Sequence, residues 1–277
     1  MAGADETVGQ SIRQEPFIQR ALVSLRLRAA DLLDSASGRR DRLTPPRRLS
    51  QYVGHGDFRA TGEEFLGLFR SLVDLGPDDR VLDIGCGIGR MARPLVPVLR
   101  PPGSYDGFDI AEPGIRWCQA HYGDTPAPFR FKHADVHNSV YNPAGRDTPE
   151  TYTFPYGDGS FDLAIATSVF THLLPEAADH YLAQAARVLA PNSRLFTTWF
   201  VTEDDQPPPP PFTPDPDMSP AATSDPAAPE TAVAYPESWL RDRLAANGLE
   251  LDAIHPGSWR SDHGGLTLQD VVVARRR

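Results

Sequence analysis

The chain has 277 residues, a formal net charge of −10 at pH 7, and 40% hydrophobic against 23% charged residues. This balance is ordinary for a globular α/β domain with additions, and its acidity argues against nonspecific nucleic-acid binding, which favours a basic surface. Two cysteines are too few for a disulfide framework, and no apolar run predicts a membrane span. Because the first residues also lack a signal-peptide pattern, the expected location is the cytoplasm.

Residues 1–60 are predicted to form a helical extension with a linker, and they are a candidate lid. Apolar residues recur at three- and four-residue steps from Pro16 to Asp34, which predicts an amphipathic helix. An arginine-rich linker follows. Residues 51–58 then join glycines with aromatics, and we expect Tyr52 or Val53 to lie over a bound ligand. A plain loop fits the same residues equally well.

Residues 61–277 are predicted to form the main domain, in which strands alternate with helices from Val81 onward. Such alternation indicates a parallel sheet with right-handed crossovers. The predicted strands cover 81–85, 104–109, 128–133, 161–167 and 193–200, with two closing strands near 249–256 and 266–274. Helices are expected at 61–73, 90–99, 112–122, 175–189 and 236–247.

A proline-rich insert covers residues 206–230, which contain ten prolines, four acids and no bases. Proline lacks a backbone donor, so the segment is predicted to form neither a regular helix nor a central strand. A flexible excursion and a polyproline-like strap are both compatible with this composition.

The ten residues Val81–Arg90 (VLDIGCGIGR) are the most informative segment of the chain. A buried strand leads into glycines, which let the backbone turn sharply into a helix and present free N–H groups to a ligand. Asp83 stands on the strand just before the turn. A carboxylate there repels a pyrophosphate but can hold an ammonium group. The loop therefore favours a zwitterionic ligand such as S-adenosylmethionine over a dinucleotide.

Polar residues follow the next strands at positions where a ligand lies in open α/β sheets. Asp109 can accept both ribose hydroxyls, although a helix N-cap is the alternative. Asp135 and the N–H of Val136 suit an adenine ring, and an ordinary turn acid fits equally well. Ser168 and His172 follow the fourth strand. His172 is either a base for an acceptor hydroxyl or a structural hydrogen-bonding residue.

The run from Val81 to Phe200 resembles the class I S-adenosylmethionine-dependent methyltransferases, on the glycine loop and the polar residues at the strand ends. Residues 141–143, 154–156, 168–173, 257–259 and 269–270 are similar to a bacterial small-molecule subgroup. The resemblance implies a Rossmann-like, doubly wound, mostly parallel seven-stranded sheet. It also implies a cofactor site: Asp83, Gly85 and Gly87 at the methionine part, Asp109 at the ribose, Asp135 and Val136 at the adenine, and Ser168 near the methyl group. Ile110 is a further cofactor-binding candidate.

The leading hypothesis is a methyltransferase that acts on a small molecule, at an oxygen because His172 is available, and releases S-adenosylhomocysteine. Methylation of a small amine and a non-catalytic cofactor-binding protein are the alternatives. Arg90 stands where a nicotinamide site needs a small residue, which disfavours an oxidoreductase. No metal site and no nucleic-acid or membrane partner are expected. A homodimer is one option for the oligomeric state. Four residues can line the acceptor site or serve in packing: Tyr141, Tyr156, Trp259 and His263.

Overall fold

The computed structural model describes Asp31 and residues 41–52, 56–260 and 264–277. Most of the predicted N-terminal helix, together with Val53 and His263, lies outside the described residues. Within the described part, no helix combines the length and apolarity that crossing a bilayer requires.

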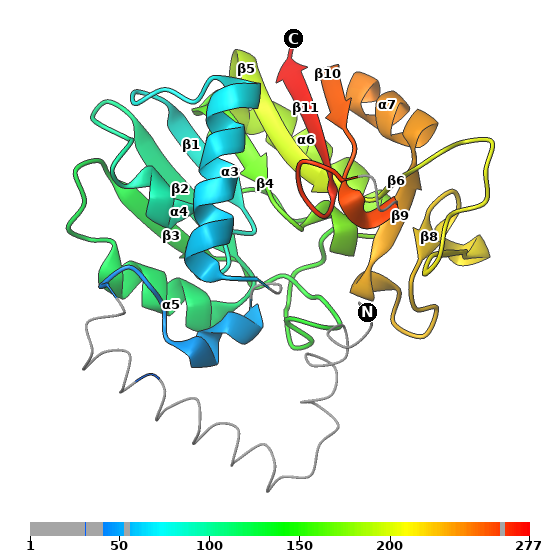
Figure 1. Ribbon diagram of the computed structural model, residues 1–277, viewed down its shortest axis with the longest axis horizontal. Helices are drawn as coiled ribbons and strands as arrows, with labels where there is room; N and C mark the ends of the chain where they lie inside the picture. Colours follow the sequence, from blue (N-terminus) through cyan, green and yellow to red (C-terminus); the bar gives the residue numbers. More distant parts are fainter. Residues whose placement is uncertain (1–30, 32–40, 53–55, 261–263) are drawn as a thin grey trace, which may run out of the picture.

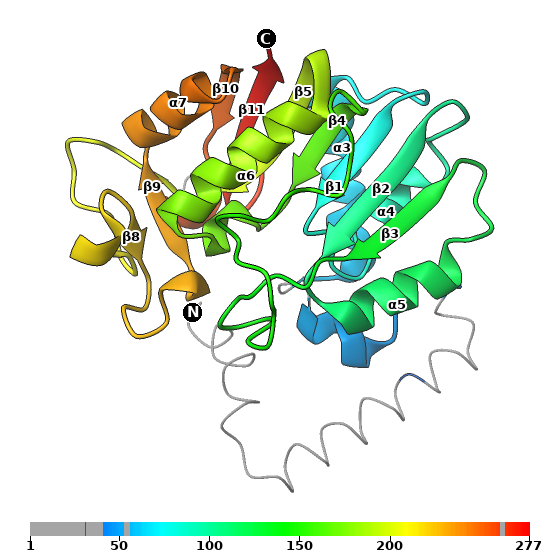
Figure 2. The same ribbon diagram turned by 180° about the vertical axis from the view of Figure 1, so that it is seen from behind.

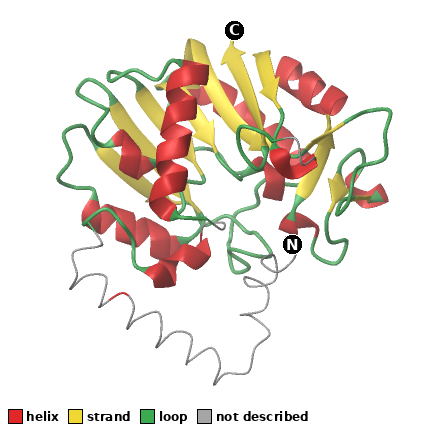
Figure 3. Ribbon diagram, viewed as in Figure 1, coloured by secondary structure: helices red, strands yellow, loops and turns green. Residues whose placement is uncertain are grey.

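A seven-stranded sheet forms the centre of the protein, in the order β10-β11-β5-β4-β1-β2-β3 (Figures 1 and 3). Six strands run in the same direction, and only β11 is antiparallel, to both of its neighbours. The predicted doubly wound sheet is therefore confirmed. The strands are β1 (Arg80–Ile84), β2 (Ser104–Asp109), β3 (Phe129–His133), β4 (Phe161–Ala166), β5 (Leu189–Trp199), β10 (Leu249–His255) and β11 (Asp270–Arg276).

Helices cover both faces of the sheet because its strands bury side chains on both sides. On β1, Val81 packs with α3 (Phe58–Val73), α4 (Ala92–Leu95) and α5 (Glu112–His121). Leu82 and Ile84 point to the opposite face, toward α6 (Pro175–Val188) and α7 (Glu237–Ala246). Figure 1 shows α3 in front of the sheet, and Figure 2 shows α6 in front of the other face. This period-two division is the reason that successive residues Val81 and Leu82 are both apolar.

Two element boundaries differ from the prediction for local reasons. The helix expected over 90–99 ends at Leu95, because Pro97 has no N–H for the Arg93 carbonyl, which accepts from Val96 instead. The fifth strand begins at Leu189, and the expected turn is a bulge within it. Asn192 adopts a φ of 63° in this bulge, a conformation that asparagine tolerates.

The proline-rich insert contains regular structure, contrary to one part of the prediction. Its strands β7 (Thr213–Pro214) and β8 (Ala222–Thr223) extend a four-stranded sheet with β6 (Val201–Thr202) and β9 (Val233–Pro236). β8 lies between β9 and β7 in this sheet, so the expectation of no central strand was wrong. The two residues of β8 are not prolines and are buried. Two 3-10 turns complete the insert, η3 (Pro216–Met218) and η4 (Pro229–Thr231).

Candidate active site

The carboxyl ends of β1, β2 and β4 meet at one edge of the sheet, which faces the lower side of Figure 1. The glycine loop after β1 occupies this edge. Gly85 and Gly87 have φ angles of 73° and 56°, which a residue with a Cβ adopts only under strain. At Gly85 a Cβ would also stand 2.4 Å from Cγ2 of Val169. The sequence therefore needs glycine here for both backbone conformation and space.

Asp83 is fully buried at the end of β1. Its Oδ2 accepts a 2.5 Å hydrogen bond from the Tyr105 hydroxyl, and its Oδ1 has no partner among the described residues. Burial, assisted by the nearby Asp109 carboxylate, raises the pKa of Asp83 to about 7, against the lowering effect of the Tyr105 hydrogen bond. A buried carboxylate with an unsatisfied oxygen is prepared to receive a cation or a donor.

Asp109 at the end of β2 is half-buried and holds the glycine loop in place. Its Oδ2 accepts from the N–H of Gly87 at 2.8 Å, and its Oδ1 accepts from the N–H of Ala111 at 2.7 Å. Desolvation raises the pKa of Asp109, while these backbone donors act in the opposite direction. Each carboxylate oxygen retains acceptor capacity for a further donor, such as a ribose hydroxyl. Ile110, which follows it, is partly buried against the core.

After β3, Asp135 and Val136 lie at the start of a structured loop. The Asp135 carboxylate accepts a 2.5 Å bond from Nε of Arg146, and this ion pair lowers its pKa. Val136 forms an isolated β-bridge with Asp147. In this bridge the N–H of His137 donates to the Asp147 carbonyl and the N–H of Asp147 donates to the Asp135 carbonyl, so the N–H of Val136 takes no part. The backbone donor proposed for adenine is therefore directed away from that pairing. The role of Asp135 itself stays a prediction, since a protein group already binds its side chain.

Ser168 is exposed at the end of β4, in the left-handed conformation with a φ of 57°. Its N–H donates to Oγ1 of Thr198 at 2.8 Å. Its hydroxyl donates to Oε1 of Gln269 at 3.0 Å, which also accepts from Thr198 at 2.6 Å. These contacts join the ends of β4, β5 and β11 in one polar cluster. Strained non-glycine residues persist where the surrounding contacts fix them, often at functional positions.

A buried carboxylate, Asp270, fixes the loop that supports this cluster. Asp270 is 0% exposed and accepts from the backbone N–H groups of Val201 and Gly257, both at 2.8 Å. It also accepts from the Trp259 indole N–H at 2.7 Å and from Arg260 at 3.3 Å. With this many donors the charge is compensated despite burial. Asp270 thus determines where its neighbour Gln269 stands.

His172 lies in the 3-10 turn η2 (Phe170–His172), four residues after Ser168. Its Nδ1 is 3.0 Å from the carbonyl oxygen of Glu230, and the ring of Tyr141 meets it edge-on at 5.6 Å between centroids. Because a carbonyl only accepts, Nδ1 carries the proton and Nε2 is the basic nitrogen of the neutral ring. Desolvation lowers the pKa of His172, although hydrogen bonds to the backbone of Glu230 and Thr231 oppose this, so the neutral form dominates near pH 7.

Of the remaining predicted site residues, one contacts His172 and others pack in the protein core. Tyr141 contacts His172, whereas Tyr156 packs against Phe161 and under the Lys132 ammonium group. Trp259 belongs to the insert core with Phe200 and Phe212. Tyr52 ends η1 (Arg47–Tyr52), but its side chain lies outside the described part, so its contact with a ligand stays a prediction.

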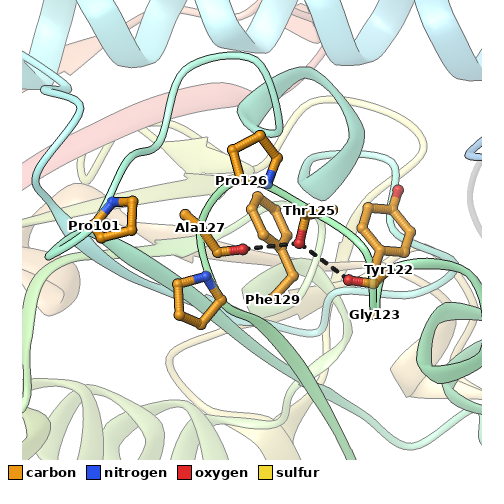
Figure 4. A pocket seen from close by; sticks show the side chains of 8 residues that line it. Pro101, Tyr122, Gly123, Thr125, Pro126, Ala127 and Phe129 are labelled. Carbon is orange, nitrogen blue, oxygen red and sulfur yellow. Dashed lines mark hydrogen bonds between the residues drawn. The ribbon is translucent and has the colours of Figure 1, made fainter.

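A pocket at the opposite end of the parallel strands is unrelated to this site. It lies between the segments that precede β2 and β3, and so at the amino ends of the parallel strands (Figure 4). Its lining is formed by Pro101, Tyr122, Gly123, Thr125, Pro126, Ala127, Pro128 and Phe129. Ligands of open α/β sheets bind at the carboxyl ends, where the glycine loop and the strand-end acids lie.

The comparisons with known proteins agree with this geometry. Residues 81–192 match the family model described as "Methyltransferase domain". A SAM-dependent methyltransferase from Methanosarcina mazei superposes with a TM-score of 0.50 at 21% identity, covering 73% of this chain and 94% of its own. Residues 81–192 of this chain are a methyltransferase domain. The fold is that of the S-adenosylmethionine-dependent methyltransferases.

Curated relatives match only part of this chain and part of their own length. An uncharacterised protein of Streptomyces fradiae is 27% identical over 66% of this chain and 48% of its own length. An O-methyltransferase of Penicillium expansum is 30% identical over 45% of this chain and 39% of its own length. The chain thus spans about half the length, or less, of these relatives.

Several residues of the candidate site escaped sequence reasoning. Tyr105 stands two positions before Gly107, which pairs with Asp83 across β1 and β2, so strand register would have placed the two side chains on one face. Thr198 and Gln269 sit at strand ends, as the predicted residues do, but no local pattern marks them. Glu230 lies in the insert, whose composition gave no indication of a contact with His172.

Proposed function

We propose that this protein transfers a methyl group from S-adenosylmethionine to an oxygen of a small molecule, with His172 as the base. We further propose that residues 61–277 form the catalytic unit and act in the cytoplasm, with residues 1–60 as a lid. The single observation that carries the oxygen acceptor is the orientation of His172. Its Nδ1–H is committed to the Glu230 carbonyl, which leaves Nε2 to take a proton.

The residues at the carboxyl edge fit the cofactor. The fully buried Asp83 has an oxygen without a partner, which suits a nearby ammonium group. Gly85 leaves space where a side chain would clash, Gly87 adopts a left-handed φ of 56°, and Asp109 has acceptor capacity for ribose hydroxyls. We assign Ile110, Asp135, Val136, Ser168 and Tyr52 to the same ligand. When bound, S-adenosylmethionine supplies an electrophilic methyl group on a positively charged sulfur.

The protein's own residues have two tasks in this reaction. In-line positioning of acceptor and donor is the main one, because a direct displacement depends on orientation. Ser168 and Gln269 supply a hydroxyl and an amide group beside the end of β4. The hydrogen bonds of Asp270 fix the position of the neighbouring Gln269. His172 then receives the acceptor proton at Nε2. Its lowered pKa keeps the ring neutral and ready to accept that proton near pH 7.

Calorimetry with S-adenosylhomocysteine and NAD(H), followed by a panel of hydroxylated and amine-bearing metabolites, tests this function. We expect binding of S-adenosylhomocysteine alone and methylation of hydroxylated compounds. Asp109→Ala should reduce that affinity by about tenfold or more, because charged hydrogen bonds are lost. His172→Ala should lower turnover and leave affinity unchanged, with His180→Ala as the matched control.

Other outcomes separate the alternatives. Methylation of amines only, with full activity in His172→Ala, would indicate an N-methyltransferase. Tight cofactor binding without transfer to any acceptor would indicate a non-catalytic binding protein. Binding of NAD(H) would contradict the proposal.

A further inference from the structure

Glu230, in η4 at the end of the proline-rich insert, joins two segments that are remote in sequence. Its Oε2 accepts from the backbone N–H of Ser139 at 2.7 Å and also from the Ser139 hydroxyl. Its backbone carbonyl accepts the Nδ1–H of His172 at 3.0 Å. One residue of the insert therefore contacts both the loop after β3 and the proposed base.

The loop that Glu230 holds is closed by internal hydrogen bonds. Asn138 and Asn142 exchange backbone hydrogen bonds of 3.1 and 3.0 Å. The Asn138 side-chain oxygen accepts from the N–H groups of Val140 and Tyr141, at 3.0 and 2.9 Å. The Asn142 side chain donates to the carbonyl of Val136 at 2.9 Å. Hydrogen bonds thus connect the loop to Val136, the residue that we assign to the adenine ring.

Glu230 consequently affects the His172 imidazole in two ways. The Glu230 carbonyl receives its Nδ1–H, and the Tyr141 ring, carried by the anchored loop, packs at 77° to it. The titratable groups packed around η2 are Glu230 from η4, Tyr141 from the loop, and Tyr235 from β9, whose hydroxyl binds the Leu173 carbonyl. No described basic side chain forms a hydrogen bond or salt bridge with the imidazole, so its orientation depends on the backbone of η4, at Glu230 and Thr231, and on the Tyr141 ring.

We propose that Glu230 is a positioning residue, which clamps loop 138–142 to η4 and thereby fixes the orientation and tautomer of His172. The insert is then a wall of the active site and not a flexible excursion. The catalytic meaning of this clamp rests on the proposed function, whereas the clamp itself does not. The carboxylate acts on Ser139, and the main chain of the same residue acts on His172.

Nuclear magnetic resonance of the full chain tests the clamp without an acceptor. Long-range proton–nitrogen spectra report the tautomer and pKa of His172, assigned with His172→Gln. The variants are Glu230→Ala, Glu230→Asp and Glu230→Gln. Aspartate keeps the charge but is one methylene too short to reach Ser139, whereas glutamine keeps the reach without the charge. Glu203→Ala, an exposed acid between β6 and the insert, is the control.

In the wild type and in Glu230→Gln we expect one neutral tautomer with the proton on Nδ1. In Glu230→Ala and Glu230→Asp we expect a mixture of tautomers, and exchange of the Ser139 amide faster by about tenfold or more. The pKa of His172 should rise toward its ordinary value near 6.5, because desolvation is the largest contribution and its net effect is to lower that pKa.

A single Nδ1 tautomer with unchanged Ser139 exchange in both Glu230→Ala and Glu230→Asp would overturn the clamp. Equal loss in the glutamine variant would also overturn it, since reach would then not matter. If Glu230→Ala fails to fold, Glu230→Asp and Glu230→Gln still give opposite predictions. Failure of the proposed function has a different signature: the tautomer behaves as expected, but the protein does not bind S-adenosylhomocysteine or does not need His172.

Discussion

Asp83→Asn removes the ionisable group of the buried residue beneath the glycine loop and keeps its shape. Burial raises the pKa of Asp83 from 3.8 to about 7, and one pKa unit corresponds to about 1.36 kcal/mol. The folded protein therefore binds this proton more tightly than the unfolded chain. Above pH 7 the ionised carboxylate costs the folded state about 4 kcal/mol, and below pH 4 it costs nothing.

Urea unfolding of both proteins across pH 4 to 8 measures this cost. The free energy of unfolding of Asp83→Asn minus that of the wild type should be smallest near pH 4. It should rise with pH through the interval between the unfolded and folded pKa values, and level off above pH 7 at about 4 kcal/mol more. Asp78→Asn, an exposed acid before β1, should show no such rise. A difference that is constant over the whole pH range would refute the reasoning.

Two further substitutions test neighbouring contacts. Tyr105→Phe removes the hydroxyl that donates to Asp83, so the pKa of Asp83 should rise further, and unfolding at pH 8 should require about 1–3 kcal/mol less; an unchanged stability at pH 8 would contradict this contact. Gly85→Ala places a Cβ 2.4 Å from Val169 at a φ of 73° and should destabilise by about 1–3 kcal/mol. Adding Val169→Ala should restore part of this loss in thermal unfolding. Gly67→Ala, in α3 with open space around it, should stabilise by up to about 1 kcal/mol.

Sequence reasoning succeeded where the residues of one short segment determine the structure of that segment. The apolar run of β1, the glycines that follow it and the acid ending β2 each depend on local backbone geometry and burial. The alternation of strands and helices then leaves few topologies, and the observed sheet is the one expected. The turn at Asn192 was predictable for the same reason, because the side chain itself tolerates the left-handed conformation.

Composition was a weaker guide to the insert. Ten prolines correctly predicted the absence of regular helices, but they did not exclude a short internal strand built from the two non-proline residues of β8. The buried contacts of Phe212, Ala222 and Ala234 hold this small sheet together. A proline count reports which backbone groups cannot donate, and it carries no information about which side chains will be buried.

The sequence by itself determined the sheet, the glycine loop and the acids at the strand ends, because each follows from local periodicity and backbone conformation. Only the tertiary structure decided which groups complete the site. Ser168 meets Gln269 across 101 positions of sequence, and His172 meets Glu230 across 58. Such contacts depend on how separate strands and turns pack together, so no local pattern encodes them. The tautomer of His172 is set in the same way, by a carbonyl that folding brings to its ring.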